Sequence, residues 1–355
     1  MHRATTPSTT TRLRASAIAL ACLAVGGVAH AQSSVSAYGL IDLSVGQFKS
    51  AGGVAIKRLD SGNMSTSFLG FKGSEDLGGG LRANFQLESF IGVDTGGAGR
   101  VSGVDAFWAR NANVSLSGGF GTVKLGRQGP PLFVSTLVFN AFGDSFGFSP
   151  SIRQYYNAPY GTPLVGDSGW NNAIGYSLPS YGGLTANVMV AAGEGAATSK
   201  GKNMGANVMY FGGPVGLTAA WQDVKSQGVL GQAISTFPGF TGQTTYQLGG
   251  SFDAGMVKLF AQYGKIKTDA TKSVRTTNYN FGAKVPMGAG ALLAQYGNST
   301  IATDGVATDT KSQIASFGYD YFLSKRTDVY AVVMLEKLTA KVHGSTYALG
   351  LKHTF

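Results

Sequence analysis

Apolar and polar side chains alternate residue by residue along most of this chain. From Val35 to Val45 every odd position is apolar or glycine, and from Leu81 to Glu88 the apolar and polar residues separate completely. Successive side chains of a strand point to opposite faces, so this rhythm predicts strands with one apolar and one polar face. The same pattern recurs over Leu217–Trp221, Tyr246–Phe252, Val257–Tyr263, Tyr279–Val285, Ala315–Tyr321 and Tyr347–Phe355.

The connections between these segments are of two kinds, which alternate along the chain. Seven are short turns, at Glu75–Gly80, Gly118–Phe120, Pro179–Gly183, Gly212–Gly216, Asp253–Gly255, Pro286–Gly290 and Leu323–Arg326. Eight are longer and polar, at Lys49–Ser65, Phe90–Val104, Gly129–Asp167, Glu194–Lys202, Lys225–Gln243, Lys265–Thr277, Ser299–Lys311 and Lys337–Ser345. Fifteen connections join sixteen strands, and an even strand number with asymmetric ends is typical of outer-membrane barrels.

The sequence therefore predicts an all-β protein: a sixteen-stranded antiparallel transmembrane β-barrel with short periplasmic turns and long external loops. In hydrocarbon every backbone N–H and C=O needs a protein partner, and a closed sheet leaves no unpaired edge. A soluble β-sandwich also alternates, but it seldom needs sixteen strands in one domain. Pro179, Pro214 and Pro286 fall at predicted turns, where a missing N–H does no harm.

The first 31 residues have a different pattern. Three arginines precede the apolar run Ala15–Val28, which Ala29, His30 and Ala31 follow. This is the pattern of a secretory signal peptide that is cleaved before Gln32, whereas a single membrane anchor would need a longer apolar run. We therefore expect a leader over residues 1–31 and a barrel over residues 32–355.

Composition narrows the function classes further. The chain of 355 residues has one Cys and four His, so a disulfide scaffold and a metal site are not expected, and no cofactor is expected either. After the three leader arginines are removed, 25 basic residues stand against 18 acidic ones, but they are scattered rather than clustered. No nucleic-acid partner is therefore expected.

Enzymatic activity is not expected. A barrel esterase or phospholipase needs a base, and the mature chain offers only His343, in a predicted loop, and His353, on an apolar strand face. No G-x-S-x-G motif is present to supply a nucleophile.

Five segments of the mature chain resemble the general porins of Gram-negative outer membranes, in particular the β-proteobacterial branch. They are Val35–Asp42, Leu69–Leu81, Phe120–Gln128, Leu323–Asp328 and Lys352–Phe355. The resemblance implies a homotrimer in the outer membrane that lets ions and small hydrophilic solutes diffuse passively. It also implies that the barrel-assembly machinery recognises Phe355. The simpler interpretation is that Phe355 is an aromatic residue that faces lipid. The resemblance further implies that outer-membrane lipid and lipopolysaccharide surround the protein.

The longest connection, residues 129–167, corresponds in this resemblance to a loop that folds inward and constricts the channel. Its aromatic content agrees with that, because Phe133, Phe139, Phe142, Phe146 and Phe148 are too many for a freely solvated loop. We expect them to pack against the inner wall. The alternative is an aromatic external patch used for adhesion.

The resemblance places an acid on this loop opposite arginines on the wall, and the chain keeps that arrangement only in part. Asp144 is the only acid between residues 129 and 166, and Arg110 matches one wall arginine. Phe68 and Gly169 or Trp170 stand where further arginines are usual, and Arg153 is a candidate replacement.

The candidate channel residues are of two kinds: the loop and wall positions given by the resemblance, and charged residues on the polar faces of strands. Arg110 and Arg127 share parity with apolar neighbours, so parity does not settle their direction. Charge in a narrow passage enriches opposite ions, and we expect a weak anion preference. The alternatives are a substrate-specific channel for small anionic solutes, a non-conducting structural or adhesive barrel, and rim positions contacting lipopolysaccharide phosphates. The candidates are Lys72, Arg82, Glu88, Arg110, Lys124, Arg127, Asp144 and Arg153.

Overall fold

The computed structural model describes residues 34–100, 105–157, 164–193, 202–225 and 237–355, and the leader expected over residues 1–31 lies outside them. Sixteen described strands form the wall: β1 (Ser34–Phe48), β3 (Phe68–Gly78), β4 (Leu81–Gly92), β6 (Asn111–Gly118), β7 (Gly121–Gln128), β8 (Trp170–Ser177), β9 (Leu184–Ala191), β10 (Asn203–Gly212), β11 (Val215–Val224), β12 (Gly242–Asp253), β13 (Lys258–Asp269), β14 (Val274–Met287), β15 (Gly290–Thr303), β16 (Thr310–Phe322), β17 (Thr327–Leu338) and β18 (Gly344–Thr354).

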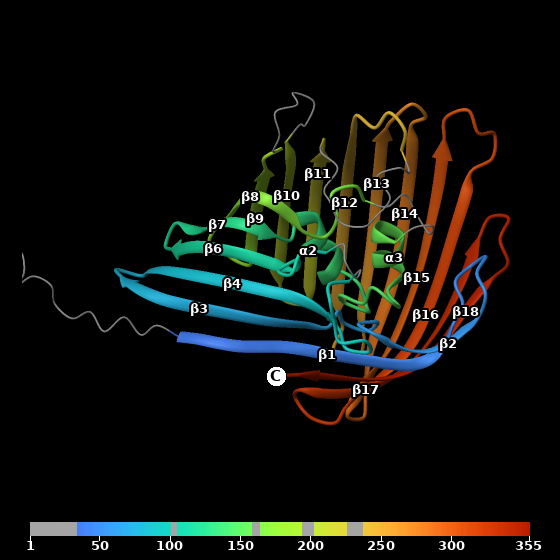
Figure 1. The fold of residues 1–355 in the computed structure, drawn as a ribbon, viewed down its shortest axis with the longest axis horizontal. Coiled ribbons are helices and arrows are strands. Elements are labelled where there is room, and N and C mark those ends of the chain that lie inside the picture. Colours follow the sequence, from blue (N-terminus) through green and yellow to red (C-terminus); the bar gives the residue numbers. More distant parts are fainter. Residues whose placement is uncertain (1–33, 101–104, 158–163, 194–201, 226–236) are drawn as a thin grey trace, which may run out of the picture.

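The wall closes because β1 pairs with strands from both ends of the chain (Figure 1). Its residues Ser34–Leu40 pair with β3, and Leu40–Gln47 pair with β18. All ladders between described strands are antiparallel. Two short strands, β2 (Ile56–Ser61) and β5 (Gly97–Ala98), pair with β1 and β4 inside external connections and add no wall strand. The predicted closed, sixteen-stranded antiparallel barrel is confirmed.

Two predicted long connections are wrong in their bounds. β13 continues to Asp269 and β14 begins at Val274, so much of Lys265–Thr277 is paired strand. β15 likewise continues to Thr303, inside the predicted Ser299–Lys311 connection. The predicted bounds were placed where the sequence becomes polar, which marks the edge of the apolar band on the outer face. Backbone pairing between the strands continues beyond that edge.

The two faces of the wall are sorted as the alternation predicted. On β12, Leu248 is 57% exposed and its neighbour Gln247 is 1% exposed. On β16, Phe317 is likewise exposed and its neighbour Ser316 is buried. Large apolar side chains therefore point outward along the wall, and polar side chains point inward. This is the reverse of a water-soluble protein, and it is stable where hydrocarbon surrounds the outside.

Two short helices lie inside the curve of the wall, α2 (Pro131–Val138) and α3 (Pro150–Tyr156) (Figure 1). Each begins with proline in its first turn, where the missing N–H is not needed. The hydroxyl of Ser149 caps α3 by accepting from the N–H of Ile152 at 3.4 Å. They pack against the inner faces of the strands from β9 to β17. None of the helices in the described chain is long and apolar enough to cross a bilayer.

Inward polar side chains bind the loop of residues 129–167 (below, loop 129–167) to the wall. Asn207 and Gln262 donate from the wall to the backbone carbonyls of Pro131 and Phe139, each at 2.8 Å. Ser316 donates to the carbonyl of Phe148 at 2.6 Å. These donors are buried, so each bond satisfies a group that would otherwise lose its contact with water.

Apolar contacts hold the same loop. Phe142 and Phe148 are buried in one cluster with Tyr330 and Val332 of β17. A second cluster contains Leu132, Ile152, Tyr155 and Ile266, and Phe133 and Phe146 pack against it. Phe139 is also buried and stacks on Phe211 with ring centroids 5.6 Å apart. The phenylalanines of this loop thus lie against wall residues.

Glycine on the inner face makes room for this packing. A Cβ at Gly264 of β13 would collide with the Tyr155 hydroxyl, and one at Gly297 of β15 would collide with the side chains of Asn280 and Gln154. Both positions allow loop 129–167 to approach the strand backbone closely.

Candidate functional site

The carboxylate of Glu88 is the centre of a polar cluster on the inner wall. Glu88 lies on β4 with inward parity and is 2% exposed. It accepts from the Tyr38 hydroxyl, an Arg110 guanidinium nitrogen and the Asn111 amide, each at 2.5 Å, and from the Gln86 amide at 2.8 Å. Four donors from β1, β4 and the start of β6 compensate for burying this charge.

Arg110 points inward although it shares parity with outward residues of β6. It precedes the first residue of that strand, Asn111, so the alternation does not fix its direction. Its guanidinium lies 4.1 Å from the ring centroid of Phe68 and 6.0 Å from that of Phe90. Phe68, which stands where an arginine was expected, therefore acts as an aromatic platform for Arg110.

Lys72 and Lys124 lie on the same wall, on β3 and β7. The ammonium of Lys72 is 4.5 Å from the ring centroid of Tyr38. Lys124 is half-buried, and its strand position is opposite Ser115 of β6. Within the described chain, neither lysine is in an ion pair with an acid. Neither lysine is thus directly paired, whereas Arg110 is, although the charge of Glu88 also acts on Lys124.

The candidates on loop 129–167 lie elsewhere. Asp144 accepts from the Ser65 hydroxyl at 2.9 Å, in the first external connection. Arg153 of α3 pairs with Glu336 of β17 at 2.6 Å and donates to the carbonyl of Gly147 at 3.1 Å. Its guanidinium thus joins the loop to the wall at β17.

Asp42 of β1 is a key residue that the sequence did not single out. It is fully buried and accepts from the backbone N–H of Met64 at 2.6 Å and of Ser65 at 3.1 Å. The Tyr330 hydroxyl donates to its other oxygen at 2.6 Å. Asp42 therefore folds the first external connection against the inner wall. Its polar parity in β1 was visible, but its partners are distant in sequence.

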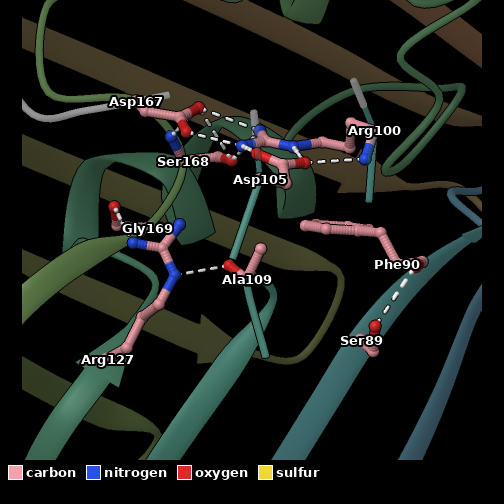
Figure 2. A network of polar contacts seen from close by, with 9 residues as sticks. All are labelled: Ser89, Phe90, Arg100, Asp105, Ala109, Arg127, Asp167, Ser168 and Gly169. Carbon is pink, nitrogen blue, oxygen red and sulfur yellow. Dashed lines mark hydrogen bonds and ion pairs between the residues drawn. The ribbon is translucent and has the colours of Figure 1, made fainter. Parts of the chain in front are cut away.

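A second ion network joins two external connections, as Figure 2 shows. The guanidinium of Arg100 contacts both carboxylate oxygens of Asp167, at 2.7 and 3.0 Å, and also contacts Asp105. Arg100 follows β5, and Asp167 ends loop 129–167, so this clamp fixes the end of the loop. The ring of Phe90 lies 4.9 Å from the guanidinium.

The clamp shifts the ionisation of both partners. Burial raises the pKa of Asp167, but the hydrogen bonds and charge of Arg100 outweigh it, so the pKa of this carboxyl lies below its ordinary value. Burial lowers the pKa of Arg100, but Asp167 and Asp105 together raise it above its ordinary value. Both groups are therefore charged at neutral pH.

Arg127 lies at the external end of β7 beside this clamp (Figure 2). It donates to the carbonyl of Ala109 at 2.5 Å, to that of Gly169 at 3.1 Å and to the side chain of Asn171 at 2.7 Å. A Cβ at Gly169 would lie 3.0 Å from its guanidinium. The small residue at 169, one of the two positions where an arginine was expected, leaves room for Arg127.

The two remaining candidates are at the end of the barrel that carries the short turns. Arg82 faces Asp76 at 3.9 Å, and both side chains are exposed. Phe355 exchanges backbone hydrogen bonds with Gly39 of β1 at 3.1 Å. The structure thus brings together Lys72, Glu88, Arg110 and Lys124, whereas Arg82, Arg127, Asp144, Arg153 and Phe355 lie apart from them.

A closed wall with an apolar outside, a polar inside and a charged inner patch is the construction of an outer-membrane channel protein. In the described residues, no group of three or more His, Cys, Asp and Glu side chains is placed to hold a metal ion.

Comparisons with known proteins identify the family. A model of the Gram-negative porins matches residues 15–340, and the chain belongs to this family. Outer membrane porin protein 32 of Delftia acidovorans is 36% identical, over 90% of this chain and 88% of that protein. An outer membrane porin of Bordetella pertussis is 25% identical, over 93% of this chain and 96% of that protein.

Solved structures agree. An anion-selective porin from Comamonas acidovorans superposes with a TM-score of 0.75 and 29% identity, covering 91% of this chain and all of that one. OmpF of Salmonella typhi shares the fold, with a TM-score of 0.65 and 17% identity over 90% and 97% of the two chains.

The protein is an outer-membrane porin, a non-enzymatic channel that passes small solutes. The predicted family, class of function and location are confirmed.

Proposed function

We propose that this porin is a homotrimeric channel for passive diffusion with a weak preference for anions, and that loop 129–167 narrows its passage. The wall of β3, β4, β6 and β7 supplies the charge that faces the solute. The preference rests on one observation, the two lysines of that wall, Lys72 and Lys124, which have no acidic partner in the described chain.

Two basic groups on the other side of the lumen are paired with acids, whereas Lys258 of β13 and Lys284 of β14, which share the parity of buried residues, form no ion pair in the described chain. Lys352 of β18 pairs with Asp328 of β17 at 2.8 Å, and Arg153 pairs with Glu336. Fixed positive charge beside a narrow path raises the local anion concentration.

The narrowing by loop 129–167 is supported by its attachment. Hydrogen bonds from Asn207, Gln262 and Ser316, and the buried rings of Phe142 and Phe148, hold it against β10–β18. That arrangement leaves the wall of Lys72 and Lys124 as the opposite side of the passage.

The assembly assignments rest on family membership and position. OmpT of Vibrio cholerae, which is 13% identical to this chain, has a solved structure in a trimer form. The early strands β6 and β7 have eight residues each and expose Val114, Leu116 and Leu125, which suits burial against neighbouring subunits. Phe355 at the end of the last strand is the residue for recognition by the barrel-assembly machinery, and residues 1–31 are the export signal. Outer rim charges face lipopolysaccharide.

Reversal potentials in a KCl gradient across a planar bilayer test the selectivity. The wild type is expected to favour chloride, and the double variant K72A/K124A is expected to lose that preference. A unit charge ~8 Å from the ion path in water contributes about 0.5 kcal/mol, with opposite sign for chloride and for potassium, so each lysine changes the permeability ratio by up to about sixfold.

The matched control is K337A, which removes a lysine whose parity on β17 is that of the exposed Leu335. Its reversal potential is expected to equal that of the wild type. Cation preference in the wild type, or an equal change in K337A and K72A/K124A, would exclude this assignment.

A further inference from the structure

Two lysines face each other on the inner wall near the short-turn end of the barrel. Lys258 begins β13 and is the register partner of Lys284 in β14. The first shares the parity of the buried Phe260 and the second that of the buried Asn280, so both point into the lumen. Opposite residues of neighbouring strands have Cβ atoms ~4.5–5.5 Å apart, and like charges at such positions repel each other. A dianion between the two ammonium groups would compensate this repulsion.

The acids of this region leave the two lysines without a direct partner. In the part of the chain that the structure describes, neither Lys258 nor Lys284 forms an ion pair. The charge of Asp320 on β16 acts on Lys284 from farther away. Asp253 of β12 is the register partner of Lys258, but it is exposed and accepts from the N–H of Gly255 at 3.0 Å. The pair thus differs from Lys352, which has an acid in direct contact.

A cavity of about 420 Å³ lies beside the two lysines, between loop 129–167 and the wall. Both lysines and Asp253 line it, together with apolar side chains from the loop and the wall. These apolar residues are Leu137, Val138, Ala141, Phe260 and Pro286. The volume falls within the ~300–1,000 Å³ that is typical of small-molecule sites, which combine an apolar lining with a few polar groups. The lining contains no residue of the cluster around Glu88, so this is a separate place in the lumen.

The charged groups of the cavity indicate the chemistry of its ligand. A phosphate monoester carries nearly two negative charges at neutral pH and has three acceptor oxygens, and lysine binds phosphate as a point charge. Two ammonium groups on opposite positions can reach one phosphate together. The Asp253 carboxylate only accepts hydrogen bonds, so it is complementary to a hydroxyl group and repels a second anionic group. The apolar side chains can contact the C–H groups of a sugar ring.

We propose that this cavity binds a small sugar phosphate, with the phosphate between Lys258 and Lys284 and a hydroxyl group at Asp253. The proposal deepens the proposed function and rests on it, because the solute reaches the cavity through the water-filled lumen. It adds a saturable binding step, on the short-turn side of loop 129–167, to passive diffusion. A dianion bound there compensates the positive charge of the wall and occupies part of the lumen, so it reduces the chloride current.

Inhibition of the chloride current across a planar bilayer tests this proposal. Glucose 6-phosphate is the probe at about pH 7.5, where its phosphate is largely a dianion, and inorganic phosphate and glucose are the comparison solutes. In the wild type, glucose 6-phosphate is expected to inhibit saturably and at lower concentration than inorganic phosphate, whereas glucose has no saturable effect. K258A/K284A is expected to raise the half-inhibiting concentration about tenfold or more, because it removes two hydrogen bonds to a charged group.

The matched control is K72A/K124A, which removes two positive charges from another part of the lumen. It is expected to change the reversal potential but to change the half-inhibiting concentration by at most about twofold, because charges at a distance are screened in water.

Further variants test recognition of the sugar. D253N keeps an acceptor oxygen for the N–H of Gly255 but removes the charge, so it is expected to reduce the preference for glucose 6-phosphate over inorganic phosphate. V138F fills the cavity and is expected to weaken inhibition by glucose 6-phosphate. V134F makes the same change one turn earlier in α2, at a half-exposed position outside the lining, and is expected to behave like the wild type.

Four results would overturn the proposal: no saturable inhibition in the wild type, equal loss in K258A/K284A and K72A/K124A, equal inhibition in V138F and V134F, or stronger inhibition by inorganic phosphate than by glucose 6-phosphate. Isothermal titration calorimetry of the detergent-solubilised protein measures the same binding without a current. A protein that conducts chloride without binding glucose 6-phosphate contradicts only this proposal, whereas one that binds it without conducting contradicts the channel function.

Discussion

At the scale of single residues, the channel wall depends on how one acid is shared. Glu88 accepts hydrogen bonds from four side chains and neutralises Arg110, while Lys72 and Lys124 keep their charge. The porin therefore has an arginine in its lumen that is balanced by a buried partner. The ion selectivity of this wall is set by the summed charge of Lys72, Arg110, Lys124 and Glu88. A substitution that removes one of these charges therefore changes the selectivity in a predictable direction.

Removing the charge of Glu88 is expected to strengthen the anion preference. In E88Q the side-chain shape is kept, and the charge of Arg110 is no longer balanced. The chloride-to-potassium permeability ratio from reversal potentials is expected to rise by up to about sixfold, because a unit charge ~8 Å from the ion path in water acts with opposite sign on the two ions. E75Q, which removes an exposed acid at the short-turn end of β3, is expected to leave the ratio unchanged. A ratio in E88Q equal to or below the wild-type value would contradict this account of the wall.

Part of this site was predictable from sequence. Parity alone placed Glu88 and Lys124 on the polar face, because each lies within a regular strand. The resemblance placed Arg110 among the wall arginines, but parity did not predict its inward direction, because it precedes the first residue of β6. Its partnership with Phe68, 42 positions away in the chain, was not predictable. Contacts that depend on which strands become neighbours around the barrel are invisible to local periodicity.

At the scale of elements, loop 129–167 is held at both its middle and its end. Buried rings and wall donors bind the middle, and the clamp of Arg100 with Asp167 binds the end. The sequence predicted the loop and the packing of its phenylalanines from length and composition. It did not predict α2, α3 or the clamp, because prolines read as turn residues also begin short helices, and Arg100 and Asp167 are far apart in sequence.

The clamp is expected to resist acid to a lower pH than an ordinary aspartate pair would. The pKa of Asp167 is lowered in the folded protein, so its contribution to stability is fully present above the unfolded value of about 3.9 and is lost as the pH falls through the lower folded value. D167N removes the contribution at every pH. Because hydrogen bonds to charged groups contribute about 1.5–3 kcal/mol, amide hydrogen exchange in residues 93–100 is expected to accelerate about tenfold or more.

Hydrogen-exchange mass spectrometry of the wild type and D167N between pH 5 and 7 measures this difference. D309N is a matched control, because Asp309 is exposed in another external connection, and its exchange in residues 93–100 is expected to match the wild type. Equal exchange rates in D167N and the wild type would show that the clamp does not hold these segments together.

At the scale of the whole molecule, the fold reverses the polarity of a soluble protein. Leu248 and Phe317 are more than half exposed, while Gln247 and Ser316 are buried beneath loop 129–167. This arrangement was the most predictable feature, because it follows from a two-residue period and from the alternation of short and long connections. The exact ends of strands were less predictable, since pairing continues beyond the apolar band, as in β13 and β14.

Single-channel recording of the refolded wild-type protein in a planar bilayer tests the central claim most directly. A water-filled barrel narrowed by a fixed loop predicts stepwise, ohmic increases in conductance at low voltage, in groups of three for a homotrimer, with chloride favoured over potassium. Insertion into the bilayer without any conductance would contradict the account, because it would mean that the polar interior is closed.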